Sequence, residues 1–108
     1  MLMTRKLEVF VDAAGRAPFE RWFNGLNAPA AARITTALAR LEQGNVSGLK
    51  SVGQGVHELR IAFGPGYRVY LGLDGPVLVI LLGGGTKKGQ QTDIEAAKSC
   101  WRAYKQRL

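Results

Sequence analysis

The sequence predicts an α+β domain with the element order β-α-α-β-β-β-α, in which helices pack against an antiparallel sheet. Three observations support this prediction. Residues 6–11 alternate apolar and polar side chains, as a strand does. Apolar residues then recur at helical spacing, and they do so again near the C-terminus. Between them, residues 56–82 form three strand-like runs separated by turn sequences.

The N-terminal part predicts a strand and then a helix. In residues 6–11, the apolar positions are Leu7, Val9 and Val11. Pro18 suits the first turn of the following helix, because proline has no backbone N–H to leave unpaired there. The apolar face of that helix consists of Phe19, Trp22, Phe23 and Leu26.

A second helix is predicted after Asn27, with Pro29 near its start and Gly44 as its stop. One face carries Ile34, Leu38 and Leu41. Residues 45–54 are polar and contain glycine, so we expect a loop there.

Three strands are predicted at residues 56–63, 67–73 and 77–82. Gly64-Pro65-Gly66 joins the first two strands, and Asp74-Gly75, a strong hairpin signal, joins the second to the third. Residues 77–82 are apolar at every position, which indicates a central strand covered on both faces.

A break is expected at Gly83-Gly84-Gly85, followed by the last helix. The apolar face of that helix consists of Ile94, Ala97, Trp101, Tyr104 and Leu108. We expect Trp22 and Trp101 to lie in the core.

The charge of the chain favours a polyanionic partner. Its 108 residues fit one domain, 1–108, and they carry 15 Lys and Arg against 8 Asp and Glu, for a net charge of +7. Residues 84–108 hold six basic and two acidic side chains. Such a surface suits nucleic acid or an acidic protein, although many basic proteins are soluble proteins without a polyanionic partner.

Other features favour a cytoplasmic protein without a metal or cofactor. Cys100 is the single cysteine and His57 the single histidine, so neither an internal disulfide nor a Cys/His zinc site is expected. The N-terminal residues lack the long apolar stretch of a signal peptide, and no apolar run is long enough to span a membrane.

The hairpin predicts a candidate site. If the turn is symmetric, Phe63 faces Tyr67 and Arg60 faces Tyr70. Alternation then separates an apolar face from a polar one. The polar face carries Glu58, Arg60, Arg68 and Tyr70. A phosphate between the arginines would relieve their repulsion, but an ordinary solvated sheet face is an equally good interpretation.

Lys87 and Lys88 follow the glycines at the exit of the third strand. Glycines allow close approach of a ligand to the backbone, yet GGGTKK lacks the spacing of known phosphate-binding loops. A flexible turn with two solvated lysines is the alternative. Alternation places His57 on the apolar face, so a structural role is favoured over that of a catalytic base.

Two segments, VHELRIAFGPGYRVYL and VLVILLGGGTKKGQQTDIEAAK, resemble the HigB-like addiction-module killer proteins of the RelE/ParE toxin superfamily. The resemblance extends to the earlier FERWFNGL and ARITTALARLEQGN segments. It implies a compact antiparallel sheet with two N-terminal helices and a C-terminal helix. It also implies a toxin paired with an antitoxin, often a helix-turn-helix HigA-like protein.

The resemblance implies cleavage of messenger RNA on the ribosome, or inhibition of DNA gyrase if the chain follows the ParE branch. Arg68 matches the arginine that contacts the scissile phosphate, Arg60 lies near a basic strand residue of the same site, and Lys87 matches the basic residue after the last strand. Lys88, Tyr70 and Gln91 are expected to contact RNA. Where several ribonuclease members carry a C-terminal tyrosine or histidine for acid–base work, this chain has Gln91, Asp93 or nothing obvious. A non-catalytic nucleic-acid-binding module is a further alternative.

Overall fold

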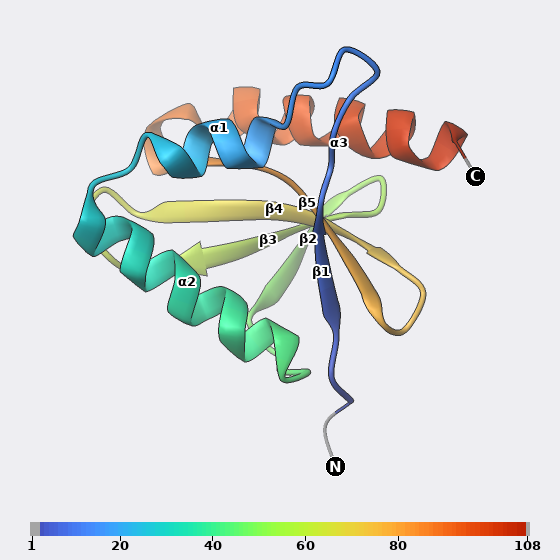
Figure 1. Ribbon diagram of the computed structural model, residues 1–108. Coiled ribbons are helices and arrows are strands. Elements are labelled where there is room, and N and C mark those ends of the chain that lie inside the picture. Colours follow the sequence, from blue (N-terminus) through green and yellow to red (C-terminus); the bar gives the residue numbers. More distant parts are fainter. Residues whose placement is uncertain (1–2, 108) are drawn as a thin grey trace.

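The computed structural model describes residues 3–107 and shows the predicted α+β fold. A five-stranded sheet with the order β1-β5-β4-β3-β2 packs with α1 and α2 on one face and with α3 on the other. Figure 1 shows α2 and α3 on opposite sides of the twisted sheet. No helix in this part of the chain has the length and hydrophobicity needed to cross a membrane. The elements are β1 (Lys6–Val9), α1 (Pro18–Asn24), α2 (Ala28–Glu42), β2 (Leu49–Gly53), β3 (Val56–Ile61), β4 (Tyr67–Asp74), β5 (Leu78–Thr86), the 3-10 turn η1 (Lys87–Gly89) and α3 (Gln90–Gln106).

The three predicted helices are confirmed, and their ends follow from local chemistry. Pro18 opens α1. Asn27 caps α2, because its side-chain oxygen accepts a hydrogen bond from the Ala30 N–H at 2.9 Å. Beyond the end of α2, Gly44 adopts a φ of 93°, which favours glycine. Leu108, expected on the face of the last helix, lies outside the described residues.

The predicted central strand is confirmed as β5, which lies between β1 and β4. Residues 79–82 are all buried, because α1 covers one face of β5 and α3 covers the other. The prediction of a wholly antiparallel sheet is wrong at one edge. There β1 runs parallel to β5, with Lys6 opposite Leu78. A parallel pair needs a long crossover, which α1, α2 and the next three strands provide.

The expected loop at residues 45–54 contains an edge strand, β2. It pairs antiparallel with β3, with Leu49 opposite Leu59 and Ser51 opposite His57. Lys50 and Ser51 are exposed. Short polar edge strands of this kind lack the alternating pattern by which strands are recognised.

The expected break at Gly83-Gly84-Gly85 is also wrong, because β5 continues through all three glycines to Thr86. A β-bulge places one extra residue of β5 opposite the Tyr70–Leu71 step of β4. A Cβ atom at Gly84 would overlap the indole of Trp22, and one at Gly85 would overlap the Asp93 carboxylate. The glycines therefore let α1 and α3 pack closely against β5 from opposite sides.

The predicted hairpin register is shifted by two positions. Arg60 lies opposite Arg68, and Ile61 rather than Phe63 lies opposite Tyr67. The connection spans residues 62–66. Gly64 and Gly66 adopt positive φ angles of 56° and 80° in it, and these angles form this longer turn. A shift by an even number of positions leaves every side chain on its expected face.

Each face of the sheet has its own core. Against α1 and α2 lie Ile61, Val69, Leu71, Val79 and Leu81, whereas Val56, Tyr70, Ile80 and Leu82 pack with α3. The expectation of a solvated polar face on the hairpin is therefore wrong. Helix α3 covers that face, and Glu58, Arg68 and Tyr70 are buried beneath it.

Candidate active site

The site is centred on Glu58, a carboxylate in β3 that is completely withdrawn from solvent. Its two oxygens bind different partners. Oε1 accepts a hydrogen bond from Nε of Arg60 at 2.8 Å. Oε2 accepts one from Nε2 of Gln90 at 3.0 Å and lies 3.5 Å from Nε of Arg68. A buried carboxylate is stable only with such partners, so Glu58 fixes the positions of the three side chains around it.

Arg60 and Arg68 differ sharply in exposure, although they lie opposite each other on adjacent strands. The Arg60 side chain is 54% exposed, whereas that of Arg68 is 7% exposed. Arg68 also donates a hydrogen bond from Nη1 to the Gly66 carbonyl at 3.0 Å. Arg60 is therefore the arginine available to a ligand, while Arg68 ties the carboxylate to the β3–β4 turn.

Lys87 reaches the same turn from the far end of β5. Its backbone N–H donates to the Gly66 carbonyl at 3.0 Å, so this carbonyl accepts from both Lys87 and Arg68. A Cβ at Gly66 would lie 3.5 Å from Nη1 of Arg68 and 3.7 Å from Cβ of Lys87. The structure thus brings Lys87 and Arg68 together at Gly66. Lys88, the next residue of η1, is exposed.

Two residues expected to contact RNA are placed differently. Tyr70 is fully buried, so its ring offers no surface to a ligand in this conformation. Burial and the negative charge of Glu58 raise the pKa of its phenol to about 12. Gln91 is exposed, but its side chain donates along α3 to Glu95 at 3.2 Å.

The arrangement combines a positive charge excess with fixed donors. Arg60, Arg68 and Lys87 outnumber the carboxylates of Glu58 and Asp93 at one end of the sheet, where Asp93 lies against Gly85. Nε of Arg60 donates to Glu58, and this hydrogen bond fixes the orientation of the guanidinium. Its two terminal nitrogens have no hydrogen-bond partner among residues 3–107. Such a group can bind a phosphate oxygen without first reorganising.

The chain matches a family model described as phage derived protein Gp49-like (DUF891) over residues 21–105. The chain belongs to the Gp49-like family. This family is of the RelE/HigB-like toxin type found in toxin–antitoxin systems. The matched region contains the whole candidate site but not β1.

A protein of Haemophilus influenzae, described as uncharacterized, is similar to this Gp49-like chain. The two are 49% identical over 81 residues, which cover 74% of this chain and 82% of the relative.

Reasoning from the sequence missed two features of the Gp49-like site. It placed Glu58 beside the arginines but gave the carboxylate no role as their anchor. A signal existed, because Glu58 and Arg60 are two positions apart on one strand and share a face. Gln90 was missed entirely. It lies in the first turn of α3, and nothing in its local sequence indicates that α3 crosses β3.

His57 and Cys100 lie outside this cluster. His57 is half-buried between Ser51 and Leu71, as its partners in the sheet register show. Cys100 packs on the α3 side, and burial raises the pKa of its thiol. Among residues 3–107, no group of three His, Cys, Asp or Glu side chains is close enough to hold a metal ion.

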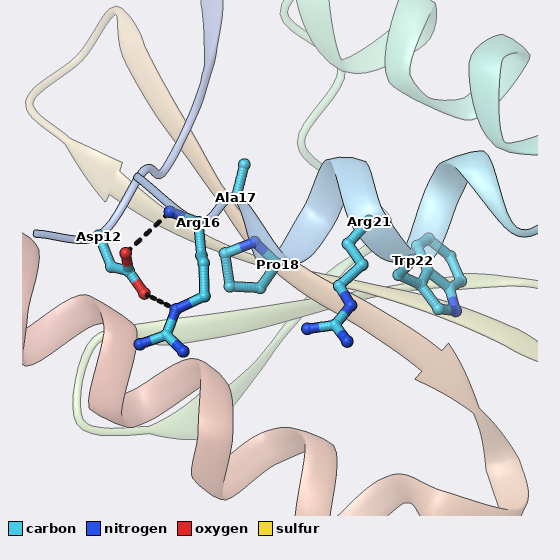
Figure 2. Close-up of a pocket in the computed structure, with 6 residues that line it drawn as sticks. All are labelled: Asp12, Arg16, Ala17, Pro18, Arg21 and Trp22. Carbon is cyan, nitrogen blue, oxygen red and sulfur yellow. Dashed lines mark hydrogen bonds and ion pairs between the residues drawn. The ribbon is translucent and has the colours of Figure 1, made fainter. Parts of the chain in front are cut away.

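A hollow of about 460 Å³ lies at the start of α1, away from the Glu58 cluster. Figure 2 shows the guanidinium groups of Arg16 and Arg21 extending to the same side of it, with Trp22 beyond. Asp12 fixes Arg16 there, because its carboxylate accepts from the Arg16 N–H at 2.9 Å and from Nε at 3.2 Å (Figure 2). The backbone hydrogen bond from Arg16 lowers the pKa of Asp12. None of the predicted site residues lines this hollow.

Proposed function

We propose that this Gp49-like chain is the toxin of a toxin–antitoxin pair and that it cleaves messenger RNA on the ribosome. One observation carries the proposal: Glu58 holds Arg60 in place, half-exposed, beside Arg68 and Lys87. The net charge of +7 supports it, because a surface with this charge attracts RNA.

The proposed reaction uses the RNA's own 2′-hydroxyl. That oxygen attacks the adjacent phosphorus and forms an O2′–P bond, while the bond from phosphorus to the 5′-oxygen breaks. A base takes the 2′-hydroxyl proton, and the leaving 5′-oxygen gains a proton. The products are a 2′,3′-cyclic phosphate and a 5′-hydroxyl. Negative charge grows on the non-bridging oxygens in the transition state, where fixed cationic donors stabilise it most.

The residues divide this work according to their exposure. Arg60 donates to the non-bridging oxygens, because its terminal nitrogens face no competing partner among the described residues. Lys87, exposed at the rim, is the candidate for proton transfer. Arg68 is buried and does not face a ligand. Its charge supports the site, and its hydrogen bond to the Gly66 carbonyl holds the β3–β4 turn, to which the Lys87 backbone N–H also donates.

Membership of the family implies an antitoxin partner. We propose that it is a helix-turn-helix protein of the HigA-like kind, encoded beside this chain. No step of the proposed chemistry draws on a metal, because side chains supply every charge it needs.

The test is induction of the chain alone in a bacterial host, followed by mapping of message ends. We expect growth arrest, relief by the neighbouring antitoxin, and new 5′ ends within translated regions. Purified protein with ribosomes and a defined message should give the same ends. Intact messages together with gyrase-dependent DNA breaks would instead establish the gyrase inhibitor. Normal growth with confirmed folded protein would overturn the toxin proposal.

A further inference from the structure

A second positively charged surface lies between α2 and the C-terminal end of β3. Two adjoining hollows of about 220 and 210 Å³ share Ala37, Arg40 and Arg60 and so form one groove. We call it the α2–β3 groove. Its lining residues are Arg33, Thr36, Ala37, Arg40, Asn45, Ser47, Gly48, Leu59, Arg60, Ile61 and Ala62.

Helical spacing aligns one wall of the groove. Arg33, Ala37 and Arg40 are related by i, i+4 and i+7, so they share one stripe of α2. The neighbouring stripe, with Ile34 and Leu41, is buried in the core. Ala37 is small, which leaves the space between the two arginines open.

The groove contains three arginines and no acidic residue. Arg33 and Arg40 are exposed, and neither has an ion pair with a residue in the described range 3–107. Arg33 is nevertheless held in place, because its guanidinium lies 4.7 Å from the centre of the Phe63 ring. Arg60 is paired with Glu58, but Arg33 and Arg40 have no such counter-charge in that range, and a bound polyanion would supply one.

The chemistry of the lining decides between a nucleic acid and a protein. A partner helix needs large exposed apolar anchors. The large apolar residues of the lining are Ile61, which is 8% exposed, and the half-buried Leu59, and both pack in the core. Arginine forks suit phosphate oxygens. Because the proposed substrate is messenger RNA, the occupant is a single sugar–phosphate chain rather than a duplex.

We propose that the α2–β3 groove binds the phosphate backbone of single-stranded RNA and leads it to the Glu58 cluster. The groove lies on the α2 side of the sheet and the Glu58 cluster on the α3 side, so the RNA would pass around the end of β3. Arg60 joins the two sides, because it lines both hollows and its Nε donates to Glu58. The inference rests on the proposed function only in taking RNA as the polyanion. Binding in the groove is independent of sequence, since phosphates carry no sequence information.

The experiment measures binding of a 2′-O-methyl RNA strand, which lacks the attacking hydroxyl, at several salt concentrations. The test variant is Arg33→Gln with Arg40→Gln. The matched control is Arg21→Gln with Arg102→Gln, which removes the same charge from exposed positions outside the groove. The plot of log affinity against log salt has a negative slope, and its magnitude should decrease by about 1.4 in the test variant, or about 0.7 for each lost phosphate contact. The control should keep the parental slope.

Equal slopes in the test variant and the parent would overturn the proposal, as would equal losses in test and control. Loss of antitoxin binding with unchanged RNA binding would also overturn it and would identify the groove as a protein interface. Because the probe cannot be cleaved, the groove can be established even if the chain proves not to be a nuclease.

Discussion

Nε of Arg68 lies 3.5 Å from Oε2 of Glu58, and the two side chains are 7% and 0% exposed. Removing Arg68 leaves the buried Glu58 carboxylate with the half-exposed Arg60 as its one remaining cationic partner among residues 3–107. Arg68→Ala should therefore lower the free energy of unfolding by about 3–5 kcal/mol. Denaturant unfolding of purified protein measures this loss.

Arg60→Ala is the control, because Arg60 is half-exposed and its removal leaves Glu58 with Arg68 and Gln90. Its cost should be smaller, about 1–3 kcal/mol, because Oε1 of the buried Glu58 loses its hydrogen bond but the carboxylate keeps its buried cationic partner. An Arg68→Ala protein as stable as the parent would show that the buried pair does not support the fold.

Arg60 provides the sharper test of chemistry. Arg60→Ala should keep the fold and reduce message cleavage by a factor on the order of 10²–10³, because a fixed donor to the transition state is lost. Arg60→Lys should restore little, since an ammonium does not reproduce the guanidinium fork. Cleavage by folded variants on ribosomes is the measurement. Lys6→Ala, an exposed cation in β1, should cleave like the parent. Full activity of Arg60→Ala would exclude the arginine from the reaction.

Gly84 should tolerate no side chain, because its Cβ would overlap the Trp22 indole. That ring packs against two others, since its centre lies 5.9 Å from the Phe19 ring and 6.4 Å from the Tyr67 ring, so displacing it would disturb both contacts. Gly84→Ala should cost about 1–3 kcal/mol of unfolding free energy, as overpacked cores do. Thermal unfolding checks this.

Gly83→Ala is the matched control in the same strand, because a Cβ there meets nothing within 4 Å. It should be close to neutral. In a Trp22→Leu background the cost of Gly84→Ala should shrink, and a cost unaffected by that change would show that the strain comes from elsewhere.

Tyr70 should make the fold sensitive to alkali. Its pKa of about 12 in the folded protein lies above the ordinary tyrosine value of 10.0, so the folded state holds the proton more tightly. The resulting stabilisation is complete below about pH 10 and is lost as the pH rises toward 12. Tyr70→Phe should remove this part of the pH dependence, measured as unfolding free energy across that range.

The same substitution has a second expected effect. The Tyr70 hydroxyl is buried without a hydrogen-bond partner among residues 3–107. At neutral pH, Tyr70→Phe should therefore be neutral or stabilising, because it removes a desolvated polar group. Tyr104→Phe is the contrasting variant, since its hydroxyl donates to Asp74 at 2.6 Å. A large loss of stability in Tyr70→Phe would mean that the hydroxyl is satisfied in solution.

The faces of the hairpin could be predicted from sequence, whereas its register could not. Alternation alone assigns Arg60 and Arg68 to one face, and a turn longer by two residues leaves that assignment unchanged. Register depends on the backbone conformation of Gly64 and Gly66, for which the sequence Gly-Pro-Gly allows more than one turn.

The sequence could not predict which element covers the hairpin face that carries Glu58, Arg60 and Arg68. The pattern predicts α3 and its apolar stripe, but not that its first turn lies over Glu58. The packing of α3 therefore decides whether Arg68 is a free ligand or a buried partner. For a similar reason the glycines of β5 looked like a loop, because their role depends on Trp22 and Asp93 from two different helices.

The parallel pairing of β1 with β5 also sets an order of events during synthesis. Strand β1 has no neighbour in the sheet until β5, residues 78–86, has been made, because β5 separates β1 from every other strand. A partly synthesised chain that lacks β5 and α3 therefore has neither a closed sheet nor the Gln90 that helps to hold Glu58. The candidate site is assembled only near the end of translation, so a nascent chain does not yet carry it on the ribosome that is making it.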